Sequence, residues 1–136
     1  MEIKQKYQLS KIVQILGKIL YEKDKDVFLS TKYKFHSNTN YRYDDTAFYE
    51  HILKVMHKEL FNVLAELDFE DEAFLILNEV TMTLGDVMKE KQDVYHYSVI
   101  GDKGEHKHTT DRKGHVIGML EWALDYIVGN IEVEEL

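Results

Sequence analysis

The sequence contains no cysteine and no proline. Without cysteine, neither a disulfide framework nor a metal site with thiolate ligands can form. Without proline, no helix is interrupted by a residue that lacks a backbone N–H group. A chain that uses no disulfide suits a reducing compartment, so we expect a cytoplasmic protein.

Long apolar runs are also missing. No stretch of about 18 apolar residues occurs, so the sequence predicts no membrane-spanning helix. The apolar segment near the N-terminus is interrupted by Gln14 and Lys18, unlike the continuous apolar core of a signal peptide. We therefore expect no membrane partner.

Basic residues are outnumbered, with 17 lysines and arginines against 25 aspartates and glutamates and a net charge of −8. Binding to a phosphate backbone relies on a basic surface, so the balance argues against a nucleic-acid partner. A partner protein with a basic surface is electrostatically easier. The same negative charge also serves solubility in many domains.

Sequence motifs for common reactions are absent as well. The chain has no glycine-rich phosphate loop, no nucleophile elbow and no cysteine nucleophile. The question of an enzymatic activity stays open, and the sequence favours a protein that is not an enzyme.

What the sequence does contain is a central stretch, Asp45 to Lys91, with the apolar spacing of two long helices joined by an acidic turn. Apolar residues recur at intervals of three and four, as on one face of a helix: Phe48, Ile52, Val55, Met56, Leu60, Val63, Leu64 and Leu67, then Ala73, Leu77, Val80, Leu84 and Val87. Asp68 is the expected N-cap of the second helix. A buried strand over Phe74 to Leu84 is the competing interpretation, since Gly85 is unfavourable inside a helix, but the length of the pattern favours helix.

The flanking segments complete an α+β fold. Helical spacing covers Leu9 to Tyr21, and a two-residue period covers 27–35, 94–100 and 105–110. A last helix is expected to begin at a cap formed by Thr109 or Thr110 and to end at Gly129. At 136 residues the chain has the length of one domain. We therefore predict a single α+β domain, 1–136, of about four helices packed over a small antiparallel sheet made of strand 27–35 and hairpin 94–110.

The hairpin carries the histidines His96, His106 and His108. Imidazole is a ligand for divalent metals, and alternate residues of a strand share a face. A bulged turn with Gly104 in the left-handed conformation would put all three histidines on one face. A tight two-residue turn would turn His96 away, but it is expected to need a positive φ at both Asp102 and Lys103. The sequence therefore favours the shared face and predicts a candidate divalent-metal site, although histidines on strands are also common at wet surfaces.

A second group of candidate ligands lies on one segment, where Glu79, Asp86 and Glu90 recur near one helical side. Carboxylates lining a helix pair can bind magnesium for hydrolysis. Such a row is also typical of a solvated face, here shared with Lys89 and Lys91.

Candidate partner-binding residues come from a polar loop and the acidic turn. Tyrosine buries a large area with few rotors, which makes Tyr41 and Tyr43 candidates for recognition or for packing over a core edge. The acidic residues Glu70, Asp71 and Glu72 are expected to join them in one exposed patch. The predicted helices carry more apolar surface than a four-helix core of this length buries, which further suggests a homodimer.

Two functions follow from these observations. The first is a small acidic non-enzymatic binding protein, such as an inhibitor or immunity-type protein for a basic partner. The alternative is a metal-dependent hydrolase or metal-binding protein that uses the hairpin histidines or the helix carboxylates.

Overall fold

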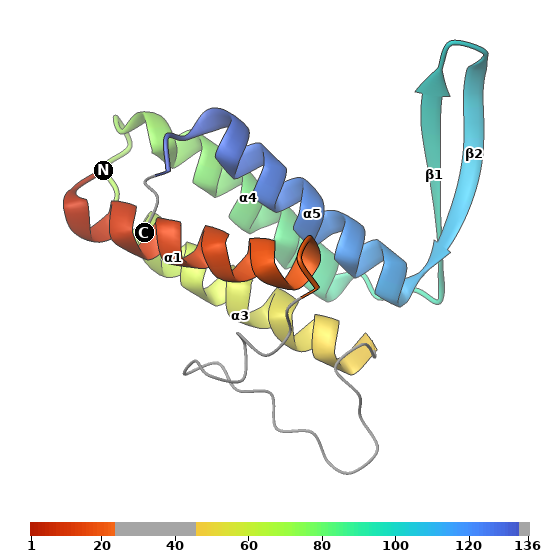
Figure 1. Ribbon diagram of the computed structural model, residues 1–136, viewed down its shortest axis with the longest axis horizontal. Coiled ribbons are helices and arrows are strands. Elements are labelled where there is room, and N and C mark those ends of the chain that lie inside the picture. Colours follow the sequence, from red (N-terminus) through yellow and green to blue (C-terminus); the bar gives the residue numbers. More distant parts are fainter. Residues whose placement is uncertain (24–45, 134–136) are drawn as a thin grey trace.

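The computed structural model describes residues 1–23 and 46–133 (Figure 1). The strand predicted over 27–35 lies outside the described residues, as do Tyr41 and Tyr43. No helix of the described part is long and apolar enough to cross a membrane.

Four helices and one antiparallel hairpin make up the described chain, which confirms the α+β class. The elements are α1 (Ile3–Leu20), α3 (Thr46–Ala65), α4 (Glu72–Lys89), β1 (Val94–Gly101), β2 (Gly104–Asp111) and α5 (Arg112–Asn130). The segment 73–84, for which a strand was the competing interpretation, is helical within α4.

The four helices pack on one another as a bundle, from one end of which the hairpin projects (Figure 1). Helices α1 and α4 each pack against α3 and α5, and α3 also contacts α5. The prediction that the helices cover the sheet is wrong, because their apolar faces cover each other and the hairpin contacts α5 near its base. The bundle therefore presents the hairpin to solvent.

The apolar stripes predicted from the sequence form the core. In α4, all five predicted core residues are buried: Ala73, Leu77, Val80, Leu84 and Val87. In α3 the buried residues include Phe48, Ile52, Met56, Leu60 and Val63, and in α5 Val116, Leu120, Ala123, Leu124 and Ile127. At roughly 25 cal/mol for each Å² of apolar surface removed from water, these faces supply the main stabilisation of the bundle.

Two helix starts differ from the prediction. The N-cap of α4 is Asp71, whose carboxylate accepts a hydrogen bond from Ala73 N at 2.9 Å, rather than Asp68. The N-cap of α5 is Asp111, whose carboxylate accepts one from Gly114 N at 2.8 Å. Thr109 and Thr110 do not cap α5, because the strand β2 continues through both residues.

Position 114, just inside the start of α5, leaves no room for a side chain unless Thr110 moves. A Cβ atom added there would lie 2.1 Å from Thr110 Oγ1, far closer than two such atoms can approach. The first turn of α5 thus lies close to the Thr110 side chain at the end of β2. At the other end, α5 runs to Asn130, one residue beyond the predicted stop at Gly129.

Candidate interaction site

The hairpin is the most exposed structured part of the described chain. Every strand residue is exposed apart from Tyr95, which is buried, and Thr110, which is half-buried. Several of the exposed side chains are apolar: Ile100 is 85% accessible, and Tyr97 and Val99 are each 48% accessible. Large apolar groups held in water on a projecting element are a feature of interaction surfaces.

The register of the hairpin is that of a two-residue loop. Gly101 pairs with Gly104, Val99 with His106 and Tyr97 with His108. The favoured bulged register, with His96, His106 and His108 on one face, is wrong: His96 pairs with Thr109 and lies on the opposite face.

The reason lies in the loop itself. Neither loop residue, Asp102 or Lys103, has a positive φ. Gly104, the first residue of β2, has a φ of 103°. A two-residue loop was expected to need a positive φ at both of the central loop residues. Gly104 absorbs the left-handed conformation one residue later, so the shorter loop forms without that strain.

The two faces of the hairpin differ in charge. One face has no acidic or basic side chain apart from histidine, and we call it the uncharged face; it comprises Tyr95, Tyr97 and Val99 of β1 with His106, His108 and Thr110 of β2. Across it, the rings of Tyr97 and His108 stack with centroids 5.3 Å apart. The opposite face carries Glu105, Lys107 and Asp111. The uncharged face is therefore the more easily desolvated of the two.

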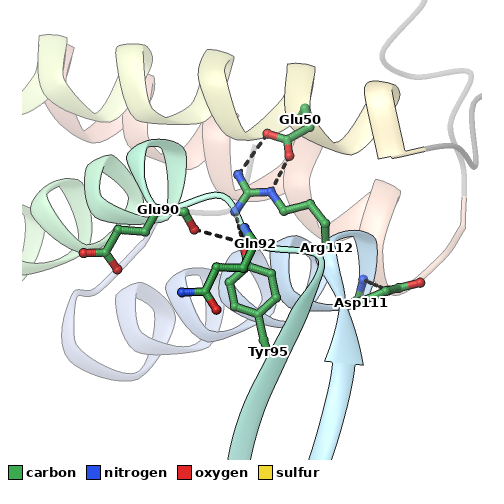
Figure 2. Close-up of polar contacts among 7 residues, drawn as sticks. Glu50, Glu90, Gln92, Tyr95, Asp111 and Arg112 are labelled. Atoms are coloured by element: carbon green, nitrogen blue, oxygen red, sulfur yellow. Dashed lines mark hydrogen bonds and ion pairs between the residues drawn. The ribbon is translucent and has the colours of Figure 1, made fainter.

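A polar anchor ties the base of the hairpin to the bundle, and Figure 2 shows it. The Tyr95 hydroxyl donates a hydrogen bond to the Glu90 carbonyl oxygen at 2.9 Å and accepts one from Gln92 N at 2.8 Å. It also accepts one from Arg112 Nη1 at 2.8 Å. One buried tyrosine thus joins the end of α4, the linker into β1 and the start of α5.

Arg112 extends the anchor to α3 through a two-pronged ion pair with Glu50 (Figure 2). Arg112 Nε donates to Glu50 Oε1, and Nη2 donates to Glu50 Oε2 at 3.1 Å. The side chains are 11% and 23% exposed, so the pair is largely shielded from water. Hydrogen bonding to Glu50 raises the pKa of Arg112, although burial opposes it. Such a paired geometry is stronger and more directional than a surface ion pair.

His115 completes the anchor on the other side of Tyr95. The two rings stack with centroids 3.8 Å apart and 7° between their planes. Burial lowers the pKa of His115, and the positive charge of Arg112 lowers it further. The neutral ring is therefore favoured beside Arg112.

The acidic residues predicted to bind a partner lie elsewhere. Glu70, Asp71 and Glu72 lead into the first turn of α4, at the end of the bundle opposite the hairpin (Figure 1). Asp71 is already engaged, because its carboxylate binds the amino group of Met1 at 2.6 Å and caps α4. The hydrogen bond from that amino group is the main cause of a lowered pKa of Asp71, and the hydrogen bond from Ala73 N lowers the pKa further. Glu70 and Glu72 are exposed.

The candidate metal ligands are not gathered in one place. Within residues 1–23 and 46–133, no three histidine, aspartate or glutamate side chains come together as a metal site requires. His106 and His108 share the uncharged face without His96. On α4, Glu79 accepts a hydrogen bond from the Tyr126 hydroxyl, while Glu90 is the C-cap of the helix.

The residues of the anchor carry no shared sequence pattern. Glu50, Tyr95 and Arg112 come from three separate segments, and the sequence places Glu50 on a polar helix face and Tyr95 on a strand. One signal was present: Arg112 directly follows the second strand, and arginine occurs twice in the whole chain.

Comparisons with protein-family models, with curated proteins and with solved structures each found no match to this chain.

Proposed function

We propose that this protein is a non-enzymatic binding protein whose partner contacts the uncharged face of the hairpin. The observation that carries the proposal is the exposure of Tyr97 and Val99, each 48% accessible, on an element that contributes little to the core. A shielded ion pair and a buried tyrosine fix the base of this element. A binding surface held rigid before contact loses less entropy on association.

The chemistry of the partner follows from charge. The chain carries a net charge of −8, so a partner protein with a basic surface would be attracted at long range. Tyrosine and histidine on the uncharged face would then supply the short-range contacts, since aromatic groups are enriched among residues that dominate binding. Glu70 and Glu72 would add to the long-range attraction. A chain without cysteine fits a reducing, cytoplasmic setting for this interaction.

The experiment compares two double variants as bait. Tyr97→Ser with Val99→Ser removes the apolar groups of the uncharged face. Leu75→Ser with Met82→Ser is the matched control, because Leu75 and Met82 are 72% and 62% exposed on α4. We expect a partner captured by the wild type to be lost by the hairpin variant and kept by the control.

Calorimetry with that purified partner gives the quantitative check. Losing two well-packed contacts of this kind weakens binding by about 2 kcal/mol or more, which is over tenfold in the dissociation constant. A partner that binds the hairpin variant as tightly as the wild type, and is lost by the α4 variant, would move the function to the helix surface.

A further inference from the structure

Charge is distributed unevenly along this acidic chain, and helix α1 is its basic element. Four of the 17 basic residues and none of the 25 acidic residues lie in α1. Lys4, Lys11 and Lys18 are exposed, while Lys6 is half-buried. Because the whole sequence has a net charge of −8, the exposed side of α1 is a local region of opposite sign.

Lys4, Lys11 and Lys18 form a row along α1, which we call the lysine line. They recur every seven residues, close to two helical turns, so successive side chains are rotated by only about 20°. Their spacing along the axis is roughly 10 Å, from a rise of 1.5 Å per residue. Lys4 Nζ is 3.7 Å from Glu66 Oε1, but both side chains are exposed, and such a pair is weak enough to be exchanged.

A pocket lies beside the middle of the lysine line, where α1 packs on α3 (Figure 1). Its volume is about 140 Å³, and its lining includes Gln8, Lys11, Ile12 and Ile15 of α1 with Met56 and Glu59 of α3. Small-molecule sites usually measure roughly 300–1,000 Å³, so this pocket suits one side chain of a partner better than a free ligand. Ile12, Ile15 and Met56 are at most 5% exposed and give it an apolar floor.

Polar groups of the pocket select what can enter it. In the part of the chain that the structure describes, Gln8 Oε1 is buried and has no hydrogen-bond partner. A buried acceptor in this state is stabilised by any group that brings it an N–H or O–H. Lys11 and Glu59 both line the pocket, so an ion of either sign would meet a like charge. The side chain that fits is therefore apolar with a donor at its tip, which describes tyrosine and tryptophan.

We propose that the lysine line binds an acidic helical segment of a partner protein, with one tyrosine or tryptophan of that segment in the pocket. Carboxylates seven residues apart on the partner helix would each face one lysine. A nucleic-acid strand fits less well, because its phosphates follow one another about every 3.4 Å and most would face no lysine. The net charge of −8 also repels such a polyanion more strongly than a segment with a few carboxylates.

This surface is separate from the hairpin, which contacts the bundle through α5. The hairpin is proposed to meet a basic partner, whereas the lysine line takes an acidic one. The two surfaces can therefore be tested independently.

The probe is a synthetic helix-forming peptide, rich in alanine, with three glutamates seven residues apart and a tryptophan one turn from the central glutamate. A fluorescent label lets anisotropy report its binding to the full chain. We expect binding at about 50 mM salt that weakens at about 300 mM, because salt screens exposed charges. A peptide of the same composition, with its glutamates spread around the helix, should bind about threefold more weakly or worse.

Two double variants test the lysine line. Lys11→Gln with Lys18→Gln removes two of its charges. Lys54→Gln with Lys58→Gln is the matched control, because it makes the same charge change at exposed positions of α3. We expect the α1 variant to weaken peptide binding about threefold or more at low salt, and the control to leave it nearly unchanged.

Gln8→Leu tests the pocket without changing charge, because it replaces the buried acceptor by an apolar group of similar size. We expect the wild type to bind the tryptophan peptide about threefold or more tightly than a phenylalanine version, which has no donor. Gln8→Leu should lose this preference. Its Tm should not fall, since the variant removes a buried acceptor that had no partner.

Several results would overturn the inference. The tryptophan peptide could fail to bind the wild type at concentrations up to about 1 mM at low salt. The α1 and α3 lysine variants could weaken binding equally, which would mean that only total charge matters. A wild type that does not distinguish tryptophan from phenylalanine would remove the pocket from the site.

Other occupants are tested with the same variants. Tighter binding of a single-stranded oligonucleotide, or of phosphatidylserine–phosphatidylcholine vesicles, that depends on Lys11 and Lys18 would replace the acidic helix as the occupant. Tyr97→Ser with Val99→Ser should bind the peptide as the wild type does, because it leaves α1 unchanged. Failure of the hairpin to hold its partner and failure of α1 to hold the peptide are therefore distinguishable.

Discussion

His115 lies flat against Tyr95, and this contact makes the anchor sensitive to acid. Burial, with the nearby charge of Arg112, holds the pKa of His115 below its ordinary value of 6.5. The unfolded chain therefore takes up a proton at this residue more readily than the folded chain does. The stabilisation is complete above pH 6.5 and is lost as the pH falls from there through the folded pKa.

Replacing His115 by phenylalanine keeps a ring against Tyr95 and removes the titrating group. We expect the free energy of unfolding of the wild type to fall between pH 7.5 and pH 5, and to fall less steeply in His115→Phe. His115→Ala, which also removes the ring, should cost a further 0.5–1.5 kcal/mol or so at neutral pH. Urea denaturation at a series of pH values measures both effects. Equal slopes in the wild type and His115→Phe would contradict the coupling.

At the scale of an element, α4 contains a glycine where a better helix former would be expected. A Cβ atom on Gly85 would lie 3.2 Å from His57 Nε2 on α3, which is tighter than an ordinary contact. The glycine thus allows the His57 side chain to lie close to α4. Glycine lowers the helix propensity of α4 at this position, but it leaves room for the His57 side chain of α3.

A double-mutant cycle separates these two effects. Gly85→Ala should raise the stability of a helix interior by about 1 kcal/mol when nothing obstructs the new methyl group. We expect that gain in the His57→Ala background and a smaller gain, or a loss, in the wild-type background. Chemical denaturation of the four proteins measures the difference. The same gain in both backgrounds would show that His57 does not restrict position 85.

The elements themselves followed from sequence periodicity because each helix buries one continuous stripe. All five apolar residues predicted for the core face of α4 are buried. The hairpin was also located correctly, but its register was not. Gly104 has the positive φ expected of it, but it pairs with Gly101 instead of adding a third residue to the loop, and this pairing sets the register. That choice decides whether His96 joins the other histidines, and no periodic pattern encodes it.

At the scale of the whole molecule, the anchor joins parts of the chain that periodicity treats separately. Arg112 and Glu50 are 62 residues apart, and Arg112 and Tyr95 are 17 apart. Their contact exists only once α3 and α5 have packed side by side. The orientation of the hairpin is therefore a product of bundle assembly, which explains why the anchor residues carried little signal in the sequence.

Breaking the anchor should free the hairpin while leaving the helices folded. Arg112→Met keeps most of the side-chain volume and removes the hydrogen bonds to Glu50 and Tyr95. Hydrogen bonds to charged groups contribute about 1.5–3 kcal/mol each, so opening of the hairpin should become over tenfold more frequent. Amide hydrogen exchange measures this directly: we expect faster exchange across β1 and β2, with core amides of α3 and α4 little changed.

Lys107→Met is the matched control, because it removes an exposed cation from β2 at a distance from the anchor. It should leave exchange in the hairpin close to that of the wild type. Uniformly faster exchange through hairpin and helices in Arg112→Met would mean that Glu50 and Arg112 stabilise the bundle as a whole. Loss of partner binding in the same variant, with Tyr97 and Val99 intact, would then be attributable to general unfolding. If exchange accelerates in the hairpin alone and partner binding weakens with it, the fixed orientation of the hairpin is what the partner recognises.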